Sequence, residues 1–404
     1  MSTRARWVPY VAVVGMFGGQ QILAPVIPPL GRSLGLSEIQ VGLFITVSST
    51  VILLASPLWG RAVSRFGPKP VIVASLLGVA AALLGFAIVT QVAVATGMSP
   101  AVTFWLLLLC RGVGFGLTAA AVPVAVQSHL AASTGTEAER VRSLGMYGAA
   151  YGLGAVVGPM LGGLLATWGL MAPLFVPPVL ILLIAVVVWV RFQSAGPSAP
   201  PEAAAERKAL SPFDPRISPY LLTGMVLFVA LTSLPVTVGF LVQDRLGLTP
   251  EQAAQQTGVA LLGYGVASLI AQGVLVRRLG WSPATLLRVG IPASMVALAG
   301  LAFAPNLATI VLATTLFGLG HGLALPGYMA GATLRVEQHE QGGLAGLIGA
   351  TNGAGSIGGP LFGTPLYAFA PGAPFLASAA LLGALALFVR WKLPAKKANQ
   401  VWQR

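Results

Sequence analysis

Residues 154–162 read GAVVGPMLG, and residues 355–363 read GSIGGPLFG. Both stretches have glycine at the first, fifth and ninth positions and proline at the sixth. Glycines four residues apart lie on one face of a helix and let a second helix approach closely, while the proline bends the helix between them. The recurrence of so specific a pattern predicts a chain built from two similar helical halves.

Two further patterns recur in the same order. GRAVSRFG at 60–67 is echoed by GVLVRRLG at 273–280, and GVGFG at 112–116 is matched by GLGHG at 318–322. Three shared patterns in one order indicate a parallel duplication of six helices each. This organisation suits alternating access, in which two bundles rock around a site near the membrane midplane.

The composition is typical of a membrane protein. Of 404 residues, 56% are hydrophobic and only 8% are charged, whereas soluble domains carry roughly 25% charged residues. A membrane-spanning helix needs about 20 mostly apolar residues. We therefore predict an all-α integral membrane fold of twelve transmembrane helices in two six-helix bundles. The expected spans are 7–30, 40–63, 71–95, 102–130, 141–168, 170–190, 220–242, 254–276, 284–304, 307–334, 343–369 and 374–389.

The chain divides into three predicted parts: an N-terminal bundle at 1–190, a cytoplasmic linker at 191–217 and a C-terminal bundle at 218–404. The linker is the longest polar stretch and is rich in proline. With both termini inside, every one of the 23 lysines and arginines is cytoplasmic except Arg32, Arg111 and Arg245. Cytoplasmic loops are enriched in these residues, so we expect a multi-pass protein of the bacterial inner membrane with both termini in the cytoplasm.

Several function classes are disfavoured. The net charge of +13 is dispersed between apolar runs rather than gathered in a stripe, which argues against nucleic-acid binding. The single cysteine, Cys110, excludes an intramolecular disulfide. His129, His321 and His339 have no metal-ligand spacing, and the sequence has no nucleophile–base pattern. We therefore expect neither an enzyme nor a metal or cofactor site.

The stretch from Gly60 to Lys69 resembles the loop between spans two and three of the major facilitator superfamily. In that family a glycine starts a tight turn, and basic residues hold the cytoplasmic gate. Ser64 stands where the family usually has Asp, so the gate ion pair would be absent or replaced by a hydroxyl contact. The resemblance implies a conformational gate formed by Gly60, Ser64, Arg65, Gly67 and Lys69.

Three other stretches extend the resemblance over nearly the whole chain. Residues 109–116 are similar to the family's fourth-span pattern with a buried arginine, and residues 24–28 to its first-span Pro-x-x-Pro pattern. The stretch at 154–163 resembles the fifth-span motif of drug and metabolite antiporters. It implies a helix-packing role for Gly154, Gly158, Pro159, Gly162 and Gly163.

With twelve spans, the chain is similar to the twelve-span drug/proton antiporters. This resemblance implies a secondary active transporter that exports a small drug-like or metabolite molecule by alternating access, exchanges it for protons, and works as a monomer in the lipid bilayer. Such efflux would contribute to multidrug resistance.

Arg111 is the only charged residue deep within a predicted span. A central arginine costs about 2.5–3.5 kcal/mol on insertion scales, so such a residue usually faces a cavity or a partner. It is our leading candidate for substrate binding. The structural alternative is an arginine that bonds carbonyls, or Gln20 and Gln21 of the first span, and only fixes helix packing.

The remaining candidates are polar residues near the expected cavity. His321 lies in the middle of the tenth span and can titrate near neutral pH, but it is equally well explained as a hydrogen-bonded packing residue. All ten acids fall in loops or at span ends, and Asp244 is the nearest to the interior. Further polar or aromatic contacts are expected from Tyr147, Tyr151, Tyr264 and Asn352.

The apparent lack of an acid in the membrane interior favours neutral or anionic substrates, because a cation next to Arg111 would be electrostatically unfavourable. An importer or facilitator of an organic anion remains the alternative. An intramembrane enzyme or a sensor derived from a transporter is a weaker possibility. Substrate, direction of flux and coupling ion stay open.

Overall fold

The computed structural model describes residues 7–134, 136–192 and 210–393. Every secondary-structure element in these ranges is a helix. The chain forms two compact units, the first made of Met1–Glu202 and Leu248–Val259, the second of Ala203–Gly247 and Ala260–Arg404. Most of the predicted linker, 193–209, lies outside the described residues.

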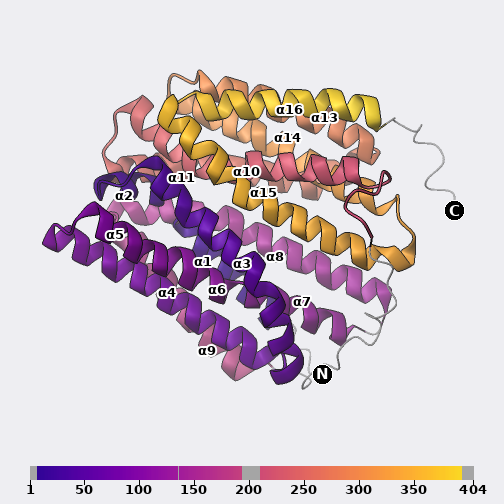
Figure 1. The fold of residues 1–404 in the computed structure, drawn as a ribbon, viewed down its shortest axis with the longest axis horizontal. Helices are drawn as coiled ribbons and strands as arrows, with labels where there is room; N and C mark the ends of the chain where they lie inside the picture. The colour runs from indigo at the N-terminus through magenta and orange to yellow at the C-terminus, as the bar shows by residue number, and fades with distance from the viewer. Residues whose placement is uncertain (1–6, 135, 193–209, 394–404) are drawn as a thin grey trace. The chain divides into compact units, whose positions relative to one another are not determined.

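The first half contains eleven short or long helical elements in the described ranges, which Figure 1 traces from indigo to magenta. They are α1 (Val8–Ile22), α2 (Ile27–Ser33), α3 (Glu38–Phe66), α4 (Pro68–Thr96), α5 (Pro100–Leu107), the π-helix η2 (Leu108–Gly114), α6 (Phe115–Ala119), α7 (Ala121–Ser133), α8 (Glu137–Leu165), the 3-10 helix η3 (Ala166–Trp168) and α9 (Ala172–Arg191).

The second half repeats this plan over its described residues. Its elements are α10 (Ser218–Leu246), α11 (Pro250–Ile270), the π-helix η5 (Ala271–Leu275), α12 (Val276–Leu279), α13 (Pro283–Ala302), α14 (Leu307–Thr333), the 3-10 helix η6 (Gln338–Glu340), α15 (Gln341–Phe369) and α16 (Ala373–Lys392). The first part of α11 belongs to the first unit and the rest to the second.

The helices support the expected membrane fold. In the described residues, ten helical segments are long and apolar enough to cross a membrane, and the pair α1 and α2 adds an eleventh if it is one span. The glycine-rich α15, which corresponds to the predicted eleventh span, has 29 residues but is not among these apolar segments, so the count in the described residues approximates the predicted twelve. The predicted all-α fold is thus confirmed, with one broken span and one span of low hydropathy.

The first predicted span, 7–30, is broken. The axes of α1 and α2 differ by 40°, and the break contains Pro25. Proline has no amide hydrogen and its ring clashes with the preceding turn, so a continuous helix cannot pass through it without a kink. The Pro-x-x-Pro pattern therefore marks a bend rather than a straight helix.

The loop expected around residues 60–69 is wrong, because α3 continues to Phe66 and α4 begins at Pro68. Of the predicted gate residues, only Gly67 lies between the two helices. Helix α3 starts at a capping box in which the Ser37 hydroxyl accepts from the Gln40 amide at 3.3 Å and the Gln40 side chain accepts from the Ser37 amide at 2.9 Å. It ends at Gly67, whose φ of 82° is a conformation that other residues rarely adopt. Pro68 then starts α4 with a favourable φ.

Each unit is held together by pairs of long helices. In the first unit, α1 packs on α8 and α4 on α9; in the second, α10 packs on α15 and α13 on α14 and α16. Figure 1 shows α10 next to α15 and α13 next to α16. The pairs α1·α8 and α10·α15 occupy the same place in the two halves, as a parallel duplication requires.

Candidate functional site

Arg111 is buried, with 3% of its surface exposed, and lies in the π-helical segment η2. Its Nη1 donates to the Ser48 hydroxyl of α3 at 3.4 Å, and its guanidinium carbon lies 4.1 Å from the centroid of the Phe115 ring. Its Nε has no hydrogen-bond partner among the described residues. Within the described ranges, the contacts of this charge are therefore one long hydrogen bond to a neutral group and one aromatic face.

The local backbone explains why Arg111 reaches this position. A π-helical turn rotates the following residues relative to an α-helix and is often found at functional sites. Further along, a Cβ on Gly116 would lie 2.8 Å from the carbonyl oxygen of Ser48. Only glycine permits this approach, and it brings the helix that carries Arg111 against the helix that carries its partner.

The structural alternative for Arg111 involved Gln20 and Gln21. In the described part of the chain, no hydrogen bond joins Arg111 to either glutamine. The Cβ of Gln21 instead packs against Gly158 of α8, 2.5 Å from where a Cβ on that glycine would lie. The structure therefore brings Arg111 together with Ser48 and Phe115, two residues that the sequence did not single out.

His321 is also buried, with 1% exposed, in the middle of α14. Its Nδ1 lies 3.5 Å from the hydroxyl of Tyr264 on α11, and its ring stacks on Phe317 with centroids 5.6 Å apart. Its Nε2 has no hydrogen-bond partner among the described residues. Of the predicted candidates, His321 and Tyr264 are thus brought together.

The other polar candidates connect helices within their own unit. The Tyr328 hydroxyl donates to Asn352 Oδ1 at 2.6 Å and joins α14 to α15. The Tyr367 hydroxyl donates to Asp244 Oδ2 at 2.7 Å and joins α15 to the last turn of α10. Each hydrogen bond joins two helices and so has a structural role. Neither Asn352 nor Asp244 forms a hydrogen bond with His321, whose partner is Tyr264.

The tyrosines of α8 lie in the first unit. Tyr151 packs edge-on against Phe17 of α1, with ring centroids 4.4 Å apart, and is 46% exposed. Tyr147 lies one turn earlier on the same helix and is half-buried. An exposed tyrosine edge within a span is compatible with a cavity lining, with lipid contact or with a helix interface.

Three of the five predicted gate residues, Gly60, Ser64 and Arg65, line an open groove along the last turns of α3, whereas Gly67 and Lys69 do not. The groove has a volume of about 600 Å³ and is lined by Pro57, Gly60, Arg61, Ser64 and Arg65. The Ser64 hydroxyl donates to the carbonyl of Gly60 in its own helix, at 3.2 Å. Ser64 therefore forms a hydrogen bond within its own helix, in place of the ion pair that an aspartate at this position would form.

The two basic gate residues rest on aromatic rings. The guanidinium of Arg65 lies 5.1 Å from the Phe66 ring centroid, and the Lys69 ammonium lies 5.5 Å from that of Trp189 on α9. Cation–π contacts at exposed sites contribute about 0.5–1 kcal/mol. Contacts of this size hold the junction of α3 and α4 only weakly.

The glycines of α8 face α1. A Cβ on Gly154 would lie 2.8 Å from the amide nitrogen of Gly18, one on Gly158 would lie 2.7 Å from the carbonyl oxygen of Gly18, and one on Gly162 would collide with the carbonyl of Ile22. Pro159 lies within the same helix. Gly163 faces elsewhere and adjoins Gly258, in the part of α11 that belongs to the first unit.

The duplicated glycines of α15 have the same role in the second unit. A Cβ on Gly355 would lie 2.5 Å from the Cβ of Phe228, and one on Gly359 would lie 2.8 Å from the carbonyl oxygen of Val229. Both partners are on α10. The repeated glycine pattern is thus a close-packing surface in each half.

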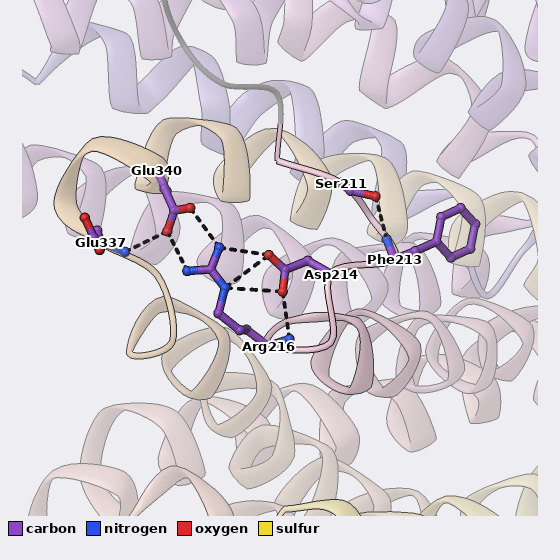
Figure 2. A network of polar contacts seen from close by, with 6 residues as sticks. All are labelled: Ser211, Phe213, Asp214, Arg216, Glu337 and Glu340. Carbon is purple, nitrogen blue, oxygen red and sulfur yellow. Dashed lines mark hydrogen bonds and ion pairs between the residues drawn. The ribbon is translucent and has the colours of Figure 1, made fainter.

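Sequence reasoning missed one polar cluster in the second unit, which Figure 2 shows. Arg216, just before α10, donates from Nη2 to Asp214 Oδ2 at 2.8 Å and to Glu340 Oε1 at 2.8 Å. These hydrogen bonds lower the pKa of both carboxyl groups and raise that of Arg216. The cluster ties the start of α10 to the start of α15. In the sequence, Asp214 and Arg216 are neighbours in one loop, and nothing there links them to Glu340 in another.

The comparison with protein families decides the identity. The model of the Major Facilitator Superfamily matches residues 10–260 and 220–404. The chain belongs to this superfamily. It is therefore a membrane transporter rather than an enzyme, as the sequence indicated.

Relatives of the chain include proteins named for drug resistance. The tetracycline resistance protein, class B, of Escherichia coli is 27% identical and aligns with 85% of this chain and 84% of its own. Multidrug resistance protein 1 of Bacillus subtilis (strain 168) is 26% identical, with 94% of each chain covered. Among solved structures, a bacterial homologue of the iron transporter ferroportin superposes with a TM-score of 0.72 at 18% identity, covering 98% of this chain and 100% of its own.

Proposed function

We propose that this transporter exports a small drug-like or metabolite molecule, neutral or anionic, from the cytoplasm in exchange for protons. Efflux is supported by the relatives named for tetracycline and multidrug resistance, which span most of the chain. The preference for neutral or anionic substrates rests on a single observation, the buried and poorly paired Arg111.

The electrostatics of Arg111 carry the substrate proposal. A buried guanidinium with one 3.4 Å neutral partner and a free-standing Nε retains the capacity for a charge-assisted hydrogen bond to an anion or a carbonyl. In the described part of the chain, the acids lie outside the spans or within the first or last turns of helices, so no carboxylate is placed to receive a cation. A permanent cation would meet repulsion that nothing offsets.

The test is transport into everted membrane vesicles under an inward-acid pH gradient. We would compare a neutral, an anionic and a permanently cationic drug of matched size. Concentrative uptake of the neutral or anionic compound, and its loss in Arg111→Ala, would support the proposal. Preferred uptake of the cation would contradict it.

A second candidate is an importer or facilitator of an organic anion, which the same weakly bonded guanidinium would bind. Direction separates the two, because an importer would accumulate the anion in right-side-out vesicles and an exporter in everted ones. A monomer in the bacterial inner membrane with cytoplasmic termini completes the proposal. Labelling of Ser198→Cys, in a Cys110→Ala background, by an impermeant reagent should succeed in everted vesicles only.

A further inference from the structure

His321 lies at a position that is matched to Phe115 of the first half. The repeated glycine pattern aligns Arg111 with Phe317 and Phe115 with His321. In each half a basic residue and an aromatic ring lie one helical turn apart, with their order exchanged, and the ring contacts measure 4.1 Å and 5.6 Å. The first half thus carries a fixed charge, and the second half carries a group that can gain one.

The turn of α14 that carries His321 is packed closely against α11 and α13. A Cβ on Gly320 would lie 2.6 Å from the amide nitrogen of Ser294 on α13, and one on Gly322 would lie 2.9 Å from the carbonyl oxygen of Ser268 on α11. The residues on both sides of the histidine are therefore pressed against neighbouring backbones. A rotation of this turn of α14 therefore requires α14 to move against α11 and α13.

Protonation changes what the ring needs. A neutral imidazole has one donor and one acceptor nitrogen, whereas the protonated ring has two donors. Here Nδ1 has the Tyr264 hydroxyl at 3.5 Å, but Nε2 has no partner in the described residues. A protonated ring therefore favours a conformation in which α14 has repacked and both ring nitrogens have acceptors, which couples protonation to conformation.

We infer that His321 is the group that takes up and releases the coupled proton, with Tyr264 as its positioning partner. This inference rests on the proposed proton exchange and deepens it. The proton passes from water on one side of the membrane to an imidazole nitrogen and, after the conformational change, back to water on the other side. No covalent intermediate or further reactant takes part.

The groups around His321 favour it over the other candidate, Asp244. The Asp244 carboxylate is exposed at the end of α10, so water reaches it in this conformation. It also accepts a hydrogen bond from the Tyr367 hydroxyl. In the described residues, the titratable or charged groups on the helices packed against α14 are Tyr264 and Glu251 of α11, Arg288 of α13, Tyr220, Asp244 and Arg245 of α10, and Tyr367 of α15, with Tyr328 on α14 itself. Arg277 and Arg278 of α12 follow η5, which also contacts α14. Of these, only Tyr264 has a hydrogen-bond contact with the ring.

The experiment measures proton binding without a transported substrate. Proteoliposomes of the full chain on a solid-supported membrane are given a pH jump, and the transient charge movement is recorded. We expect a transient in the wild type and a fall to less than about one fifth of it in His321→Gln, since glutamine does not titrate. Tyr264→Phe should keep the total charge moved but shift its pH midpoint.

His129→Gln is the matched control, because His129 is also buried in a span, against Phe192 with ring centroids 4.7 Å apart. It should move as much charge as the wild type, as should His339→Gln at the surface. A full-sized transient in folded His321→Gln would overturn the inference, and so would the absence of any transient in the wild type. Failure of the proposed export appears separately, as absent drug uptake by a wild type that still binds protons.

Discussion

The guanidinium carbon of Arg111 lies 4.1 Å from the centroid of Phe115, one turn further along the same span. Together with the Ser48 hydroxyl, this ring is the environment that the fold provides for the charge. A desolvated cation–π contact is worth about 2 kcal/mol, comparable to the insertion cost of about 2.5–3.5 kcal/mol for a central arginine. The protein can thus hold Arg111 in the membrane without an acid.

Arg111→Ala should abolish transport while the protein still inserts and folds, because loss of a poorly paired buried charge need not destabilise a bundle. Arg111→Lys should restore little activity, since lysine lacks the planar fork of donors. Uptake into vesicles measures activity, and size-exclusion profiles of the purified variants measure folding. Normal transport by folded Arg111→Ala would remove Arg111 from the site.

Ser48→Ala tests whether the neutral partner matters. The variant removes the 3.4 Å hydrogen bond to Nη1 and should lower the free energy of unfolding by about 1–3 kcal/mol, because it leaves a buried charged donor without a partner. The concentration of anionic drug that half-saturates transport should fall or stay equal, because Nη1 of Arg111 no longer donates to the Ser48 hydroxyl and can donate to the drug instead. Ser56→Ala, on the same helix with a hydroxyl bonded to its own backbone, is the control. A larger loss of stability would show that Ser48 chiefly fixes the fold.

Gly158→Leu should impair folding or conformational exchange without a specific change in substrate affinity. A Cβ at this position would lie 2.7 Å from the Gly18 carbonyl, and leucine would force α1 and α8 apart. Gly148→Leu on the same helix is the matched control, since nothing lies within 4 Å of its Cβ position. Equal yield and turnover in the two variants would rule out close packing at Gly158.

The Arg216 cluster gives a prediction about pH. Hydrogen bonds from Arg216 lower the pKa of Asp214 and Glu340 below their ordinary values of 3.8 and 4.5. A carboxyl group with a lowered folded-state pKa stabilises the fold above its ordinary pKa and loses this effect as pH falls through the folded-state value. Arg216→Gln should therefore unfold at a lower temperature than wild type at pH 7, and the gap should narrow below about pH 4.

The cluster is exposed, so salt should narrow the same gap in melting temperature. Arg335→Gln provides a comparison, because Arg335 follows α14 in the same unit and has no side-chain hydrogen bond in the described part of the chain. A difference in melting temperature between wild type and Arg216→Gln that depends on neither pH nor salt would mean that the arginine acts through packing alone.

The fold was largely predictable because each half repeats strong local signals. Apolar runs located the spans, and the glycine patterns of α8 and α15 indicated close packing that the structure places against α1 and α10. The resemblance to the major facilitator superfamily is confirmed. The break after α1 was missed because Pro25 lies within an apolar run, where hydropathy does not report backbone geometry.

The partners of the candidate residues were harder to predict. That Arg111 meets Ser48 rather than Gln20 or Gln21 depends on the rotation of the π-helical segment η2, and composition does not encode this rotation. The Arg216 cluster joins loops separated by more than a hundred residues. Such contacts follow from tertiary packing, so sequence patterns alone leave them open. The roles assigned to the gate and substrate residues stay predictions.

The most direct test of the central claim is uptake of the matched neutral, anionic and cationic series into everted vesicles containing wild type or Arg111→Ala. The account predicts concentrative, pH-gradient-driven uptake of the neutral or anionic compound by wild type, little uptake of the permanent cation, and no uptake by the folded variant. Preferential accumulation of the cation by wild type would contradict it.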